Sequence, residues 1–487
     1  MAKAVPKEFI AKMSGLLGEE ETAKLLEALN HPMEHGLRVN TGRMSVEAFL
    51  ALSPWKVTSI PWCPSGLYLN EDAVADPPSR HPLYYAGAYY LQEPSAMLPA
   101  AALPVRPGDR VLDLCAAPGG KSTALAEKLK GEGVLVCNDI SASRAKALIK
   151  NLELFGVSNA VVTAETPEHL AGVFEHYFDR ILIDAPCSGE GMFRKSSAMI
   201  SDWSEEKPME YAAIQREILP HAIRMLRPGG MLLYSTCTYS PEEDEGSVQF
   251  LLEHPEAKEM GLRLAEIPYC PGFLPGDPKW TEGGSDDLVK TVHMLPSRVR
   301  GEGHFAALFT SGEAKEPSPE SREPSPSVYR LSSDPKKVAG NLRSFEKKYP
   351  DFADFCRSAN ILWDSSRLSE QSGYLSYLPD AYDLPGLKGL RVMRRGLFLG
   401  EIRKNRYEPS QALAMTLSPD SFGNCLKLSL TDERVLRYLR GETLEYEPGE
   451  ARDGWVLITI GELPLGFGKA KDGRIKNKYL PGWRIGA

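Results

Sequence analysis

Along residues 106–310, short apolar runs alternate with segments whose apolar positions recur every three or four residues. Continuous apolar runs suit strands that are buried on both faces, and the three-to-four spacing suits helices. In chain order the segments are VLDL, STALAEKL, GVLVCNDI, SRAKALIKNLELFG, AVVTAE, RILIDAP, QREILPHAI and GGMLLYSTC. The alternation predicts an α/β fold with a doubly wound parallel sheet and helices on both of its faces.

Cysteine and aspartate residues lie where the predicted strands end. Cys115, Asp139, Asp184 and Cys237 each close or follow one of these strands. Ligands of open α/β sheets bind at the carboxyl ends of the strands. The pattern therefore predicts a functional site at this edge.

Three further regions flank the predicted sheet domain of residues 106–310. Residues 1–105 start with a helical pattern and end in the aromatic stretch HPLYYAGAYYLQEP, which predicts a smaller α/β extension. Residues 311–327 include GEAKEPSPESREPSPS, where apolar residues vanish, so we expect a linker there. Residues 328–487 form a further C-terminal region.

Composition narrows the class of protein. A chain of 487 residues is too long for one core and suggests two to four domains. The net charge of -8 does not suggest a nucleic-acid binder, so charge must be considered by region. The eight cysteines include no CxxC pair, which is typical of a reduced compartment. No apolar run approaches a membrane span and the start lacks a signal-peptide pattern, so we expect a cytoplasmic protein without membrane contact.

The histidines add no metal site. The nine His residues are dispersed, and no Cys/His set has zinc spacing. We therefore expect no metal, and we expect a monomer.

The loop DLCAAPGGKST, residues 113–123, lies between a predicted strand and a predicted helix. Glycines let the backbone approach a ligand, and the free amides of a helix start favour a negative group. A phosphate-binding loop would need glycine at Cys115, and the dinucleotide pattern GxGxxG is absent. The remaining ligand of this shape is S-adenosylmethionine. A magnesium-dependent nucleotide hydrolase, suggested by RILIDAP, and a turn without a ligand stay open.

Asp139 lies 19 residues after Gly120, at the end of the next predicted strand. A carboxylate there can accept hydrogen bonds from both ribose hydroxyls of a bound nucleoside. The alternative is an N-cap for the following helix.

Two cysteines lie fifty residues apart at neighbouring strand ends, Cys187 in DAPCSGEGMFRK and Cys237 in YSTCTYSPEEDE. A single cysteine is usually structural, but two beside turns at a ligand-binding edge suggest chemistry. A thiolate that adds to carbon 6 of a pyrimidine makes carbon 5 nucleophilic enough to accept a methyl group. Asp184, kept protonated or held beside ring nitrogen 3, could hydrogen-bond the base.

The three motifs together resemble the Nop/Sun family of S-adenosylmethionine-dependent RNA cytosine-5 methyltransferases. The resemblance extends to LRVNT, YYLQEPSAML and GEGHFAALF, and so spans most of the first 310 residues. It implies a Rossmann-like methyltransferase sheet and an N-terminal extension like an RNA-recognition (RRM-like) fold. His304 stands where the family more usually has an aromatic residue.

The family resemblance also implies residue roles. It assigns the nucleophile to Cys237 and product release or base assistance to Cys187. DNA cytosine-5 methyltransferases attack from a Pro-Cys motif, which would make Cys187 the nucleophile. A contact to the adenine side is expected near Glu165, where the family usually has Asp, or at the adjacent Thr166. The implied cofactor contacts are Cys115, Ala116, Ala117, Pro118, Gly119, Gly120, Lys121, Asp139, Glu165 and Asp184.

Two basic segments offset the acidic average of the chain. Residues 391–410 carry six basic and two acidic residues, and residues 469–484 carry six and one. Both interleave aromatics and glycines, which suits contacts with phosphates and bases, although a solvated charged face is the alternative. With GELPLGFGK, they resemble the PUA-like RNA-binding region of bacterial RsmF-type members, which methylate cytosine in 16S rRNA.

We therefore expect methyl transfer to carbon 5 of a cytosine in ribosomal RNA or the small ribosomal subunit. The base must leave any helix to reach the pocket. A tRNA cytosine-5 methyltransferase and a non-catalytic RNA-binding ribosome-assembly factor stay open as alternatives.

Overall fold

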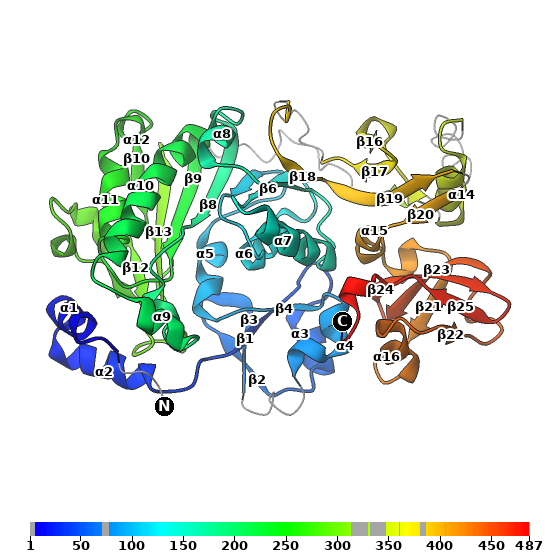
Figure 1. Ribbon diagram of the computed structural model, residues 1–487, viewed down its shortest axis with the longest axis horizontal. Coiled ribbons are helices and arrows are strands. Elements are labelled where there is room, and N and C mark those ends of the chain that lie inside the picture. Colours follow the sequence, from blue (N-terminus) through cyan, green and yellow to red (C-terminus); the bar gives the residue numbers. More distant parts are fainter. Residues whose placement is uncertain are drawn as a thin grey trace.

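The computed structural model (Figure 1) describes residues 5–70, 77–312, 330–331, 347–359, 361–379, 386–404 and 406–486. From residue 313 onward, the predicted linker lies outside these ranges. Among the described helices, none is both long enough and apolar enough to cross a bilayer.

A ten-stranded sheet forms the centre of the fold, in the order β11-β12-β13-β9-β8-β5-β6-β7-β18, with β10 paired to β13. Strands β5 to β9 are parallel, and the remaining pairs are antiparallel. The chain runs outward from β5 through β6 and β7 and returns to β8, so the strand order reverses at β5 and β8, where such sheets bind ligands. The predicted doubly wound sheet is confirmed, with antiparallel strands added at both edges. The bounds are β5 (Arg110–Asp113), β6 (Val134–Asn138), β7 (Ala160–Thr163), β8 (Phe178–Asp184), β9 (Leu226–Thr236), β10 (Leu262–Ala265), β11 (Leu274–Pro275), β12 (Val292–Met294), β13 (His304–Ser311) and β18 (Val392–Arg395).

Helices cover both faces of this sheet, because strand side chains alternate between the faces. Leu182 of β8 packs with Leu125 and Leu148 on one face. Its neighbour Ile183 packs with Leu219 on the other. The first face carries α5 (Leu98–Ala102), α6 (Gly120–Leu129) and α7 (Ala142–Leu154), and the second carries α8 (Pro167–Ala171), α10 (Lys207–Met225), α11 (Glu245–Glu253) and α12 (Pro255–Glu259).

The N-terminal region contributes a helical hairpin and a small sheet. Phe9 of the hairpin packs against Phe193 and Trp203, with ring centroids 5.2 and 5.6 Å apart. Arg38 of the small sheet is 2 % exposed and forms an ion pair with Glu127 of α6. Both parts are thus fastened to the central domain. Their elements are α1 (Lys7–Leu17), α2 (Glu19–Leu29), β1 (Gly36–Val39), α3 (Val46–Leu52), β2 (Val57–Ile60), β3 (Cys63–Leu69), α4 (Pro82–Tyr85) and β4 (Tyr89–Leu91), with α9 (Ser197–Asp202) beside the hairpin, and the sheet order is β2-β3-β1-β4.

The described C-terminal residues form a two-stranded sheet, β14-β15, and two larger sheets of four and five strands, in the orders β16-β17-β19-β20 and β21-β23-β24-β25-β22. The two larger sheets share an apolar core that contains Leu399 and Phe467. The elements are β14 (Arg330–Leu331), α14 (Pro350–Ala359), β15 (Ile361–Leu362), β16 (Leu368–Gln371), β17 (Tyr374–Tyr377), β19 (Leu397–Arg403), β20 (Arg406–Pro409), α15 (Gln411–Thr416), β21 (Cys425–Leu428), α16 (Glu433–Leu439), β22 (Leu444–Glu445), β23 (Gly454–Ile460), β24 (Leu463–Lys471) and β25 (Arg474–Asn477). Short 3-10 helices are η2 (Pro78–Arg80), η3 (Ser95–Met97), η4 (Glu190–Met192), η5 (Pro278–Trp280), η6 (Asp286–Lys290), η7 (Ser365–Arg367), η8 (Pro419–Ser421) and η9 (Pro481–Trp483).

The strand β18 joins the C-terminal region to the central sheet. It pairs antiparallel with β7, with Val392 opposite Thr163. Arg394 of β18 also forms an ion pair with Glu153 of α7. The first basic segment was predicted to bind RNA, yet its residues 392–395 form an edge strand of the central sheet.

Candidate active site

The loop of residues 113–123 connects β5 to α6 as predicted. Gly119 has a φ of 110°, in the left-handed region that favours glycine, and a Cβ there would lie 3.0 Å from Leu148 Cδ1. A Cβ on Gly120 would lie 3.1 Å from the ring of Tyr90. The glycines therefore let the loop pack closely on α7 and β4. They also begin a helix whose first backbone amides have no partner within the helix.

The loop begins with a buried acid, Asp113, and also holds a partly exposed thiol, Cys115. Asp113 is fully buried, accepts a 2.6 Å hydrogen bond from Ser122 Oγ, and has an Oδ1 without a partner in the described structure. Burial raises the pKa of Asp113 to about 7. Burial also raises the pKa of Cys115, which therefore stays a thiol. Asp113 was not among the predicted site residues, although its position at a strand end was a signal.

Asp139 is joined to the loop. Its Oδ2 accepts a 3.3 Å hydrogen bond from Ala117 N, and its Oδ1 accepts a 2.9 Å bond from Ser141 N. The neighbouring Ala116 N donates to Asn138 O at 2.7 Å. The N-cap of α7 is Ser141, so the alternative of Asp139 as the N-cap is wrong.

Glu165 makes its contacts within the protein. Its Oε2 lies 3.1 Å from His169 Nδ1, and its Oε1 accepts a hydrogen bond from the backbone N–H of Arg391. Its side chain is 11 % exposed. Thr166 caps α8 through its hydroxyl. A cofactor contact from Glu165 or Thr166 stays a prediction.

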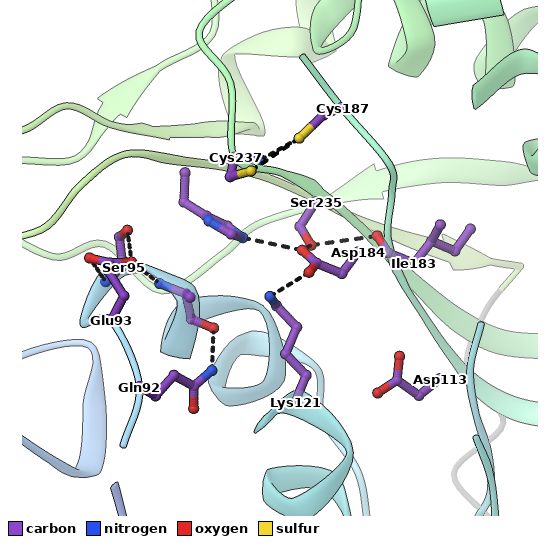
Figure 2. Close-up of polar contacts among 12 residues, drawn as sticks. Gln92, Glu93, Ser95, Asp113, Lys121, Ile183, Asp184, Cys187, Ser235 and Cys237 are labelled. Atoms are coloured by element: carbon purple, nitrogen blue, oxygen red, sulfur yellow. Dashed lines mark hydrogen bonds and ion pairs between the residues drawn. The ribbon is translucent and has the colours of Figure 1, made fainter. Parts of the chain in front are cut away.

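The structure brings the two predicted cysteines together (Figure 2). Cys187 Sγ lies 3.1 Å from Cys237 Sγ and accepts a 3.3 Å hydrogen bond from Cys237 N. They meet because Asp184 at the end of β8 lies opposite Ser235 near the end of the parallel β9. Hydrogen bonding to Cys237 and burial raise the pKa of Cys187 well above its usual value. Cys187 is therefore held as a thiol.

Asp184 lies beside the sulfur atoms and is surrounded by donors (Figure 2). Lys121 Nζ donates to Oδ2 at 2.7 Å, and Ser235 Oγ donates to Oδ1 at 2.9 Å. His304 Nε2 lies 3.4 Å from Oδ1. Enclosure alone would raise the pKa of Asp184, but the charge of Lys121 and the imidazole of His304 outweigh it and hold the pKa well below its usual value. Asp184 is thus ionised, which disfavours the protonated form considered from the sequence.

Two buried glutamates tie the cysteine-bearing loops to each other. Glu190 accepts hydrogen bonds from Trp203 Nε1 at 2.8 Å and from Tyr239 N at 3.0 Å. Glu243 Oε2 accepts a 2.9 Å bond from Ser188 N, and burial raises the pKa of Glu243 to about 7. Both lie within the two cysteine motifs, but neither was among the predicted site residues. In the described ranges, no three His, Cys, Asp or Glu side chains are grouped to hold a metal ion.

The second basic segment, residues 469–484, lies on the C-terminal sheets. The ammonium groups of Lys469 and Lys478 lie 5.7 and 5.4 Å from the ring of Trp455. Lys478 also forms a 3.0 Å ion pair with Glu408, which joins this segment to the first one. The two predicted basic segments are therefore neighbours in space.

Comparisons with known families cover most of the chain. Residues 100–310 match the family described as 16S rRNA methyltransferase RsmB/F, and residues 5–94 match the N-terminal domain of 16S rRNA methyltransferase RsmF. Residues 354–417 match the RsmF rRNA methyltransferase first C-terminal domain. Residues 425–485 match the methyltransferase RsmF PUA domain, as the sequence led us to expect.

Similar whole proteins and solved structures agree with these matches. The chain is 33% identical over 489 residues to ribosomal RNA small subunit methyltransferase F of Enterobacter sp. (strain 638), covering 97% of this chain and 95% of that protein. It is 34% identical over 470 residues to the protein of that name from Escherichia coli (strain SE11), covering 93% and 91%. A methyltransferase homolog from Pyrococcus horikoshii is 28% identical with a TM-score of 0.55, covering 63% of this chain and 95% of that one. The NSun6 structure from the same organism, with SFG, shares the fold at 23% identity and a TM-score of 0.54, covering 64% and 99%. The chain belongs to the RsmF branch of the RsmB/F family of 16S rRNA methyltransferases.

Proposed function

We propose that this protein methylates carbon 5 of a cytosine in 16S rRNA, with S-adenosylmethionine as the methyl donor. The reaction passes through a covalent bond between Cys237 Sγ and carbon 6 of the base. The observation that carries this proposal is the 3.1 Å separation of the Cys187 and Cys237 sulfur atoms at the ligand-binding edge of the sheet. Carbon 5 of cytosine becomes nucleophilic only after such an addition.

Cys237 must react as a thiolate, and only about 3 per cent of a thiol with an ordinary pKa is ionised at neutral pH. The ammonium of Lys121 lies close enough to interact with the charge of Cys237. When Cys237 Sγ bonds to carbon 6, the electron pair of the ring double bond moves towards carbon 5 and the ring heteroatoms. Lys121 can stabilise that charge by donating a proton or a hydrogen bond.

Asp184 supports the choice of cytosine over uracil. As an ionised carboxylate it accepts hydrogen bonds and donates none. Cytosine presents an amino group at carbon 4, whereas uracil presents a carbonyl oxygen that Asp184 would repel. The hydrogen bonds from Lys121 and Ser235 fix the carboxylate for this contact.

Cys187 is assigned to product release. Once a water molecule has taken the proton at carbon 5, the electron pair of that C–H bond re-forms the ring double bond, the bond between carbon 6 and Cys237 Sγ breaks, and its electron pair returns to the sulfur. Cys187, held as a thiol 3.1 Å away, can donate its S–H to that sulfur as it departs. A raised pKa suits this role, because Cys187 then still carries the proton that it donates.

The start of α6, Asp139 and Ile140 fit S-adenosylmethionine, which would supply an electrophilic methyl group when bound. The free amides at the start of α6 suit its carboxylate. Each oxygen of Asp139 accepts one hydrogen bond from the protein and keeps a lone pair for a ribose hydroxyl. Ile140, which follows Asp139, is 69 % exposed and offers an apolar face to an adenine ring. The nucleotide hydrolase considered from the sequence does not accord with membership of a methyltransferase family.

The C-terminal sheets are the proposed contact for RNA outside the pocket. A hollow of about 540 Å³ is lined by Arg406, Arg452, Trp455 and Lys469, together with the acidic Asp351, Asp354 and Asp453. The cationic groups can contact phosphates, and the indole can stack on a base.

The experiment is methyl transfer from tritiated S-adenosylmethionine to unmodified 16S rRNA, small subunits and tRNA. Digestion and chromatography should place the label in 5-methylcytidine from 16S rRNA, and the Cys237→Ala variant should transfer none. Label in another nucleoside, or in tRNA alone, would contradict the proposal. No transfer to any RNA would favour a non-catalytic assembly factor.

A further inference from the structure

His304 is a buried imidazole that lies beside Asp184 without a hydrogen bond to it. It begins β13 and is 3 % exposed. Its Nε2 has no hydrogen-bond partner among the described residues, although Asp184 Oδ1 lies 3.4 Å away. A buried polar group without a hydrogen bond is destabilising, so a functional reason is expected.

The register of the sheet places His304 beside the nucleophile. In the antiparallel pair of β13 and β9, Phe305 lies opposite Thr236 and Ala306 lies opposite Ser235. Continued by one residue, the same register sets His304 opposite Cys237. Residues opposite each other share a face, with Cβ atoms roughly 4.5–5.5 Å apart. His304 therefore shares a face with both Cys237 and Ser235.

The charges of the pocket favour a proton acceptor at this position. Asp184 from β8 faces His304 at 3.4 Å, Lys121 from α6 is hydrogen-bonded to Asp184, and Cys237, which follows β9, lies against the Cys187 thiol. Lys121 and Asp184 together are neutral. If Cys237 lost its proton to solvent, the enclosed group would carry one negative charge, which is unfavourable in a partly dry site. Transfer of that proton within the group leaves it neutral.

We propose that His304 is a further catalytic residue, the base that takes the proton of Cys237. The Sγ–H bond of Cys237 breaks and leaves its electron pair on sulfur, and an N–H bond forms at Nδ1 of His304. The resulting imidazolium directs Nε2–H at Asp184, which stabilises it. Cys187 protonates the sulfur of Cys237 as the product leaves, and the proton held by His304 then returns to the cysteine pair and restores both thiols. This inference rests on the proposed function, in which Cys237 is the nucleophile.

Alkylation of Cys237 tests the inference without RNA or cofactor. The full-length protein is treated with iodoacetamide between pH 5.5 and 9.5, and modification of Cys237 is followed by peptide mass spectrometry. His304→Phe, which resembles the aromatic residue usual at this position, and His304→Gln should each lower the rate at pH 7 at least about 10-fold. Each should also move the curve to higher pH, while Cys425 in the same samples reacts unchanged. Superimposable Cys237 curves would overturn the proposal.

Single-turnover methylation provides the second readout. Both variants should lose about 10²-fold in rate at pH 7, and the loss should shrink as pH rises and the thiol ionises unaided. A change in KM alone, without a change in the pH profile, would make His304 a positioning residue of Asp184 and overturn the assignment. Thermal unfolding and S-adenosylhomocysteine binding establish whether the variants are folded. If His304→Phe does not fold, the test is made with His304→Gln alone. If the wild type methylates no RNA, the alkylation curves still decide the role of His304.

Discussion

Lys121 Nζ donates a 2.7 Å hydrogen bond to Asp184 Oδ2, although the two residues lie 63 positions apart. The bond joins the first turn of α6 to the end of β8, so the glycine loop and the sheet together fix it. It places a fixed positive charge and a fixed negative charge beside the two sulfur atoms. Each functional group of the site is therefore held by an element of the sheet domain.

Replacing Lys121 should show how far catalysis depends on this charge pair. We expect Lys121→Met to lower the single-turnover rate about 10²-fold, because charge developing on the base loses its stabilising cation. The pKa of Asp184 should also rise towards its usual value. Lys427→Met, which removes an exposed pair with Glu462, is the control and should retain the wild-type rate. A Lys121→Met rate within a factor of two of wild type would refute the role.

The two cysteines should separate in a trapping experiment. Cys187→Ala should accumulate a covalent complex with RNA that survives denaturing electrophoresis, because release is impaired after the adduct forms. Cys237→Ala should form none. Cys425→Ala, at a thiol on β21 in the C-terminal region, should behave as wild type. The reverse pattern would exchange the two roles.

Glu243 should make stability depend on pH. Burial raises its pKa from 4.5 to about 7, so the folded chain binds the proton more tightly than the unfolded chain. The stabilisation is complete below the unfolded pKa and is lost as pH rises through about 7. Glu243→Gln keeps an acceptor for Ser188 N. It should raise the free energy of unfolding, relative to wild type, by roughly 2–3 kcal/mol more at pH 8 than at pH 5.

Urea denaturation at the two pH values measures this difference. The exposed Glu256→Gln serves as the control and should show no such change. An equal effect of Glu243→Gln at both pH values would mean that Glu243 is ionised in the folded protein.

The ion pair between Arg394 and Glu153 should hold β18 against the sheet. Both side chains are mostly buried, at 21% and 16% exposed. Arg394→Met leaves Glu153 without its partner and should reduce the free energy of unfolding by about 1–3 kcal/mol. Arg403, whose side chain is 53% exposed, forms an ion pair with Glu401. Arg403→Met should change the free energy of unfolding by less than about 0.5 kcal/mol. Similar urea midpoints for Arg394→Met and Arg403→Met would mean that the ion pair of Arg394 with Glu153 does not hold β18 against the sheet.

Lys469 should contribute to RNA binding and leave the chemistry unchanged. Lys469→Ala should weaken binding of 16S rRNA and reduce the slope of log affinity against log salt by about one. The single-turnover rate at saturating RNA should stay at the wild-type value. Lys427→Ala, whose ammonium is engaged by Glu462 at 2.6 Å, is the matched control. An unchanged salt slope in Lys469→Ala would place the RNA elsewhere.

The sequence by itself determined the sheet and the edge that carries the site. Apolar runs such as RILID must be buried on both faces, and the intervening helical patterns supply the cover, so local periodicity is sufficient. The same periodicity placed Asp184 and Cys237 at neighbouring strand ends. The glycine motif predicted a cofactor loop, and the family resemblance added the PUA region, which a match to the RsmF PUA domain confirms.

Only the tertiary structure decided which distant residues meet. It set β18 against β7, engaged Glu165 with the backbone of Arg391, and placed His304 beside Asp184. These contacts depend on the order and direction of strands in the sheet, which residues far apart in the chain fix jointly through packing. A local pattern reports which face of a strand is buried, but it does not report which strand lies next to it.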